Sequence, residues 1–262
     1  MHNKNGIDVH CHVILMENTA EVVKEAMHKM RALINIATDM KEVEQTIELS
    51  KKYPYFVFSS AGLHPEGAAE ASQKEIDEML EFISENRKQL VSIGEVGIDY
   101  YHVKDQDKRK RAEEVFIQFI ELANQLKKPL QIHARNSEER RSAFSDAIKI
   151  LTDNNARSVI MHSFSGSDDE LMHALEQGYY ISISTIIGRS NKHKRLATKT
   201  SIDKLLLETD SPWLHPYERN SVNHPWNIIE SAKIISGLIE KNQEEILHIT
   251  EANAINVFGL DL

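Results

Sequence analysis

Two histidines one residue apart, His10 and His12, follow a short apolar segment that begins at Gly6. Alternate side chains of a β-strand point to the same face, so a His-x-His pair at the end of a strand directs two imidazoles into one small volume. Histidine is the commonest metal ligand among the side chains. The pair therefore predicts a metal site, provided that further ligands reach the same place.

Five further apolar segments run into residues that can bind a metal. A single histidine after a strand is more often structural, but several independent segments that end in this way indicate one shared site. The residues that follow or end these segments are His64, Glu95, His133, His162 and the pair Glu208 and Asp210.

Four histidines and two carboxylates exceed the needs of one catalytic metal, which usually takes three protein ligands. We therefore predict two divalent ions about 4 Å apart. Zn, Mn, Co and Mg all suit such donors. Glu95 is expected to bridge the two ions, with His10, His12 and Asp210 at the first and His133 and His162 at the second. Asp210 is also expected to accept a proton from the attacking water, which makes Asp210 and Glu95 the predicted catalytic residues and indicates a hydrolase.

Strand-like and helix-like patterns alternate along the chain. Such alternation predicts a parallel sheet, and eight units in 262 residues predict one (β/α)8 TIM barrel, a fold of about 250 residues whose sites lie at the carboxyl ends of the strands. No linker divides the chain, so a single domain over residues 1–262 is expected, with an additional C-terminal helix. An open doubly wound sheet is the alternative, but no Gly-rich loop follows the first strand. The strands are predicted near 6–10, 31–37, 55–61, 90–95, 129–133, 157–162, 179–184 and 204–208, and the helices near 20–30, 41–52, 73–87, 107–127, 138–154, 168–177, 191–199, 226–240 and 243–257.

The bulk properties exclude some functions. A net charge of −9 argues against a protein that coats nucleic acid through a basic surface, although bound cations would still let an enzyme meet phosphates. No segment has the roughly 20 apolar residues of a membrane span, and the N-terminus lacks the apolar core of a secretory signal. The only cysteine, Cys11, is expected to be a buried packing residue. We predict a cytoplasmic protein with no membrane association.

The chain resembles the TatD-type metal-dependent deoxyribonucleases of the amidohydrolase-like barrel superfamily. The resemblance spans nearly the whole chain, and it implies a TIM barrel, two divalent ions and phosphodiester hydrolysis of DNA. Carried over by position, it implies the same six metal residues, namely His10, His12, Glu95, His133, His162 and Asp210. The motifs that carry it are residues 8–12, 62–65, 93–100, 132–135, 161–167, 207–214 and 253–259.

Two departures from the family pattern concern the substrate. Many relatives have a histidine directly after Gly-x-His-Pro, where this chain has Glu66, a carboxylate that cannot donate to a phosphate but could help to bind an extra cation. Relatives also often carry an arginine before the asparagine that aligns with Asn223, and here the nearest arginine is Arg219. We expect His64, Arg135 and Asn223 to contact the substrate, Arg135 either by gripping a phosphate or by pairing with a nearby acid.

The residues predict a hydrolase, and the resemblance implies an exonuclease that acts on single-stranded DNA or on frayed or 3′ ends. One alternative is an amidohydrolase-like enzyme that acts on another ester, lactone or amide bond, although no lysine ends a predicted strand to bridge the metals as a carboxylated lysine does in that wider group. The other alternative is a catalytically silent metal-binding barrel. The metal identity and the oligomeric state are open at this point.

Overall fold

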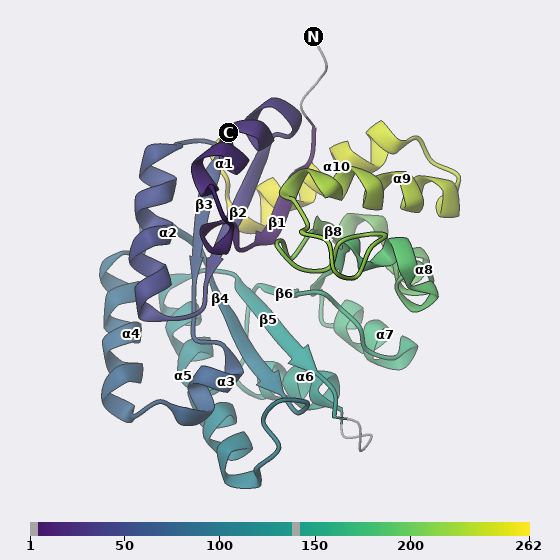
Figure 1. Ribbon diagram of the computed structural model, residues 1–262. Coiled ribbons are helices and arrows are strands. Elements are labelled where there is room, and N and C mark those ends of the chain that lie inside the picture. The colour runs from purple at the N-terminus through teal and green to yellow at the C-terminus, as the bar shows by residue number, and fades with distance from the viewer. Residues whose placement is uncertain (1–4, 138–141) are drawn as a thin grey trace.

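The computed structural model describes residues 5–137 and 142–262, and Figure 1 shows strands surrounded by helices. Eight strands pair in parallel in chain order. Their bounds are β1 (Ile7–Cys11), β2 (Ala32–Ala37), β3 (Val57–Ala61), β4 (Leu90–Asp99), β5 (Leu130–Arg135), β6 (Val159–Met161), β7 (Tyr180–Ser184) and β8 (Leu205–Glu208).

The sheet curls into a nearly closed barrel because the segment after β8 meets the end of β1. The backbone N–H of Asp210 donates to the carbonyl of His10 at 2.9 Å, and the N–H of His12 donates to the carbonyl of Ser211 at 2.7 Å. Strand order and closure confirm the predicted TIM barrel. They also bring the ends of the first and last strands side by side, where the predicted ligands lie.

Helices cover the outside of the strands, with α2 and α4 on one side and α7 and α8 on the other in Figure 1. In α5 an apolar face that includes Phe116 and Phe119 is buried. The helix bounds are α1 (Thr19–Lys29), α2 (Met40–Lys52), α3 (Pro65–Glu70), α4 (Gln73–Glu85), α5 (Gln106–Leu126), α6 (Ala143–Asp153), α7 (Asp168–Glu176), α8 (Asn191–Lys199), α9 (Ile228–Ile239) and α10 (Gln243–Phe258), with short 3-10 turns η1 (Val13–Leu15), η2 (Thr185–Arg189), η3 (Ile202–Lys204) and η4 (Pro225–Asn227). Among the described residues, none of these helices is both long and apolar enough to cross a membrane.

Helix α10 is the predicted additional C-terminal helix, since α9 already follows the eighth strand. Phe258, the last residue of α10, packs in one buried cluster with Ile7 at the start of β1 and Ala32 at the start of β2. The C-terminal helix therefore covers the amino ends of these strands and leaves their carboxyl ends open.

Two elements differ from the prediction. Strand β4 continues to Asp99 instead of ending at Glu95, with a shift of register against β5 between Ile93 and Val96. The short helix α3 was not predicted, because six residues are too few to show a helical period. The start of the fifth predicted helix, residues 138–141, lies outside the described residues.

Candidate metal centre

The six predicted metal residues meet at the carboxyl end of the barrel. They come from five strands around the ring: His10 and His12 lie at the end of β1, Glu95 lies in β4, His133 lies in β5, His162 follows β6 and Asp210 follows β8. His10, His12, Glu95 and His162 are buried, whereas His133 and Asp210 are partly exposed at the opening of the barrel.

Four donor atoms form a first group around one point. The Nε2 atoms of His10 and His12 lie 3.3 Å apart. Oε2 of Glu95 lies 3.6 Å from His10 Nε2 and 4.0 Å from His12 Nε2. Oδ1 of Asp210 lies 4.0 Å and 3.6 Å from the same two nitrogens. Donors bound at about 2.1 Å to a tetrahedral ion lie about 3.4 Å from one another, so this spacing fits an ion at the centre of the group.

The other oxygen of Glu95 belongs to a second group. Oε1 lies 2.5 Å from Nδ1 of His133 and 3.6 Å from Nε2 of His162. Glu95 thus divides its two oxygens between two sets of histidines, as the predicted bridge requires. His10, Glu95 and His162 form one set that could hold an ion, and His10, His12 and Asp210 form another.

In His162 and His133, the second ring nitrogen is held by a neighbouring carboxylate. Nδ1 of His162 bonds to Oε2 of Glu208 at 3.0 Å, and Nε2 of His133 bonds to Oδ2 of Asp99 at 3.0 Å. Such contacts fix the tautomer and the orientation of a histidine that binds a metal through its other nitrogen. This geometry supports an orienting role for Glu208.

A chain of hydrogen bonds inside the barrel orients His10, and it was not predicted. Nδ1 of His10 bonds to Oε1 of Gln131 at 2.9 Å, while Gln131 Nε2 donates to Ser92 Oγ at 3.2 Å. Ser92 in turn donates to Ser60 at 2.8 Å. One signal was present in the sequence, because Gln131 alternates with His133 and therefore points to the same face of β5.

Asp8 was another functional position that the prediction did not include. It is fully buried, and its Oδ1 accepts from the backbone N–H of Thr209 at 2.9 Å while Thr209 Oγ1 donates to Oδ2 at 2.5 Å. Burial raises the pKa of Asp8 well above its usual value, despite these hydrogen bonds. Asp8 thus ties the strand that carries His10 to the segment that carries Asp210.

At His133 and His162, burial and the neighbouring carboxylates shift the pKa in opposite directions. Burial disfavours a charged imidazole, but Glu95 and Asp99 outweigh it at His133 and raise its pKa to about 9. At His162, Glu208 and Glu95 likewise outweigh burial and raise the pKa to about 10. These two rings therefore carry protons at neutral pH when no cation is bound, and a metal that binds there must displace them.

In the first donor group, burial outweighs the neighbouring charges in setting the pKa values. Burial, together with the neighbouring His10, lowers the pKa of His12 to about 3, so its imidazole is neutral and ready to act as a ligand. Burial raises the pKa of Asp210 to about 6. Among the described residues, no Lys or Arg lies within ion-pair distance of Glu95 or Asp210. The donor set of imidazoles and carboxylates therefore fits divalent cations as its charge partners.

Two cavities open onto the cluster. The first, of about 460 Å³, is lined by His64, Trp213 and Arg135 and reaches Glu95. The second, of about 270 Å³, is lined by Ser163 and His193 among others. Trp213 is half exposed, and its ring meets that of His12 edge-on at 5.1 Å. The exposed guanidinium of Arg135 lies 4.2 Å over the ring of Tyr101. His64 and Arg135 thus line the cavity that leads to Glu95, and their contact with a substrate stays a prediction.

Asn223 lines neither of these two cavities. It is fully buried, and its Nδ2 donates to Thr185 Oγ1 at 2.8 Å and to the carbonyl of Thr209 at 2.9 Å. Its Oδ1 accepts from Asn227 Nδ2 at 2.8 Å. This burial does not support the predicted substrate contact. We correct the assignment to a positioning role, since Asn223 holds the segment just before Asp210 against η2.

Two basic runs of the sequence lie largely outside the site. In residues 108–111 at the start of α5, Lys108 pairs with Glu70 and Arg109 donates to the carbonyl of Tyr100 at 2.9 Å. In residues 192–195, Arg195 pairs with Asp168 on α7 at 3.1 Å, and only His193 lines a cavity of the centre. Local contacts therefore engage Lys108, Arg109 and Arg195 away from the centre.

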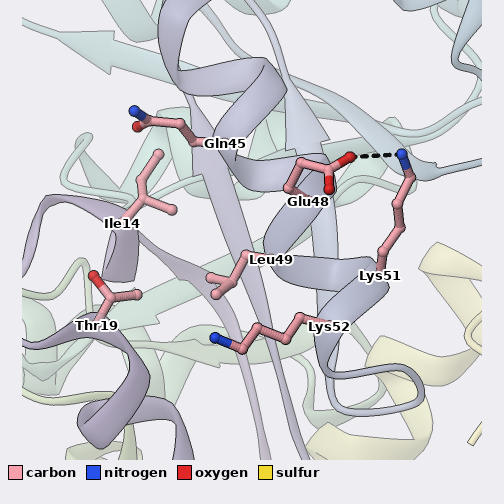
Figure 2. Close-up of a pocket in the computed structure, with 7 residues that line it drawn as sticks. All are labelled: Ile14, Thr19, Gln45, Glu48, Leu49, Lys51 and Lys52. Atoms are coloured by element: carbon pink, nitrogen blue, oxygen red, sulfur yellow. Dashed lines mark hydrogen bonds and ion pairs between the residues drawn. The ribbon is translucent and has the colours of Figure 1, made fainter.

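A larger cavity, of about 700 Å³, lies on the outer surface between η1 and α2. Figure 2 shows its lining of Ile14, Thr19 and residues of α2, with Glu48 and Lys51 paired at 2.7 Å. It contains no histidine and no group of metal-binding side chains, so size alone does not mark the site of chemistry here.

Comparison with known proteins gives a consistent result. The family model described as "TatD related DNase" matches residues 7–259. A human protein named "Deoxyribonuclease TATDN3" is 31% identical over 266 residues, which cover 96% of this chain and 94% of the relative. An uncharacterized metal-dependent hydrolase of Methanocaldococcus jannaschii is 30% identical and covers 98% of both chains.

Solved structures share the fold. The crystal structure of YjjV, a TatD homolog from Escherichia coli K12, superposes with a TM-score of 0.87 at 21% identity, over 98% of each chain. A TatD-family hydrolase from Entamoeba histolytica superposes with a TM-score of 0.82 at 20% identity, over 97% of this chain and 98% of that one. At these identities the likeness concerns the barrel itself.

Proposed function

This chain belongs to the TatD-related DNase family of metal-dependent hydrolases, and from this premise we propose that it cleaves phosphodiester bonds at the ends of single-stranded or frayed DNA, with two divalent ions. The observation that carries the proposal is the division of the two Glu95 oxygens between two groups of histidines. His10, His12 and Asp210 would hold one ion, and His133 and His162 would hold the other.

The bound ions would lower the pKa of a water molecule towards neutrality and offset the charge of the phosphate. The protein supplies the positions. Glu208, Asp99 and Gln131 orient three of the ligand rings, so the donors are preorganised in the fold. Asp210 lies at the rim of the cavity and accepts the proton of the attacking water at its carboxylate.

The substrate groups have partners around this centre. Arg135 presents a guanidinium above Tyr101, and this fork suits the oxygens of a phosphate. Trp213 offers a half-exposed indole face on which the end base of a single strand can stack. Among the described residues that line the two cavities, Arg135 is the one Lys or Arg and Trp213 is the half-exposed aromatic ring. This lining fits a short stretch at a strand end better than an extended duplex.

The test is release of nucleotides from end-labelled single-stranded DNA by protein reconstituted with Mn²⁺ or Zn²⁺. We expect release that depends on the divalent ion, stops on chelation and resumes when the metal is returned. Single-stranded RNA and a blunt duplex serve as parallel substrates. Release that is equal from all three would contradict the preference for DNA strand ends.

The alternatives make different predictions in the same assay. Protein that holds its metals but releases no nucleotide would favour another ester, and carboxylic and phosphate monoesters should then be tried. Protein that binds metal but hydrolyses none of these substrates would match the silent metal-binding barrel.

Replacement of Glu208 by Gln tests the orienting role. The amide keeps the size of the buried side chain but loses the charge that faces His162, so we expect metal affinity to fall about 10- to 100-fold. Competition with a chromogenic chelator measures the change. Glu81→Gln on the exposed face of α4 is the matched control, and equal affinities of the two variants would remove Glu208 from the centre.

A further inference from the structure

Four side chains gather beside the metal centre, and one of them, His64, also offers an atom within 4.8 Å of donor atoms of Glu95 and His133. They are His64 and Glu66 around the start of α3, and Asp99 and His102 at the end of β4. Glu66 and His102 are exposed, whereas Asp99 is buried. All four line the cavity of about 460 Å³ that leads to Glu95.

Their donor atoms converge. Nδ1 of His102 lies 2.8 Å from Oδ2 of Asp99 and 3.5 Å from Oε1 of Glu66. Oε1 of Glu66 lies 3.8 Å from Nδ1 of His64. His64, Glu66 and Asp99 each offer an atom within 4.8 Å of the others. These separations resemble those of the first donor group, where an ion fits at the centre.

The backbone holds this arrangement in place. Oδ1 of Asp99 accepts the N–H groups of Tyr101 and His102, both at 2.8 Å, so the turn after β4 folds back and returns the His102 ring over the Asp99 carboxylate. Oδ2 of Asp99 faces both His102 and His133. The same carboxylate therefore connects this cluster to the second group of the metal centre.

The cluster has more negative charge than fixed positive charge. Among the residues that the structure describes, the ion pairs of Glu66 and Asp99 are to histidines only, and no Lys or Arg lies within 4 Å of either carboxylate. An unneutralised carboxylate in this cavity would repel a phosphate that approaches the centre. A divalent cation would reverse the sign of the local charge and attract the phosphate instead.

We propose that Glu66, Asp99, His102 and His64 bind an additional divalent cation at the entrance of the cavity, separate from the two ions of the centre. Two carboxylates and two imidazoles suit Mn²⁺ or Zn²⁺. Because Glu66 and His102 are exposed, this cation exchanges more readily than ions at the buried donors. The cation offers a second contact for a substrate phosphate. Without the cation, the negative charge of Glu66 would repel that phosphate.

The experiment counts bound Mn²⁺ in the full-length protein by electron paramagnetic resonance of the free ion during titration. Wild type should bind one Mn²⁺ more per chain than Glu66→Gln and His102→Asn, or bind the last ion at least about tenfold more tightly. Glu70→Gln, an exposed acid on the same short helix, is the matched control and should behave as wild type.

Equal numbers and affinities of Mn²⁺ in wild type and in both cluster variants would overturn the proposal. Two variants are used because each removes a different exposed ligand, and circular dichroism verifies that both are folded. The count of bound ions does not depend on turnover. A protein that fails to cleave DNA can still bind the additional ion, so the two proposals can fail separately.

Discussion

Asp210→Asn is expected to lower the turnover of single-stranded DNA by about 10²- to 10⁴-fold at saturating metal, because the amide cannot accept a proton from the attacking water. Asparagine is the appropriate replacement for a structural reason. The backbone of residue 210 has a φ of 58°, in the left-handed region that Asp and Asn tolerate better than other side chains. Its backbone hydrogen bond to His10 remains available in the variant.

The measurement is kcat in the end-labelled assay, together with the thermal midpoint of the metal-loaded protein. Asp77→Asn, the same change at an exposed position of α4, controls for the loss of one negative charge. A rate close to that of wild type for Asp210→Asn would remove this residue from the mechanism. A large drop in the thermal midpoint would instead assign the effect to folding.

Replacement of Glu95 by Ala should be more severe, since both oxygens of this buried side chain face ligand nitrogens. We expect the variant to lose at least one metal ion per chain. Its turnover should fall by at least about 1,000-fold, because metal activation contributes several kcal/mol to transition-state stabilisation. Metal analysis of the dialysed protein and the nuclease assay report the two effects independently.

A third measurement strengthens this test. Ligands that bind only the folded state raise its stability in proportion to the logarithm of their concentration. Added Mn²⁺ should therefore raise the thermal midpoint of wild type and of the control Glu81→Ala more than that of Glu95→Ala. Full metal content with an unchanged rate in Glu95→Ala would refute the bridging role.

Much of the centre could be predicted because it depends on local regularities of the chain. The period of two places His10 and His12 on one face of a strand, and parallel strands bring their carboxyl ends to one end of a barrel. Residues from β1, β4, β5, β6 and β8 could thus be assigned to one site without knowledge of any distance between them. The six residues do lie together in the structure, while their role as ligands remains a proposal.

Other features depended on contacts between distant parts of the chain. The fourth strand was predicted to end at Glu95, but a shift of register lets β4 continue to Asp99. That extension brings Asp99 to His133 across the neighbouring strand. Asn223 seemed available to the substrate by analogy, yet the tertiary structure buries its amide among Thr185 and Thr209.

By itself the sequence determined the fold class, the strand order and the residues that gather at the carboxyl end of the barrel, because hydrophobic periodicity and strand direction are properties of each segment. Only the tertiary structure decided which nitrogen of each histidine faces Glu95, which polar groups orient the rings, and that Glu66 meets His102. These relations join side chains from different strands and loops. They depend on register and rotamer, which packing sets and no single segment encodes.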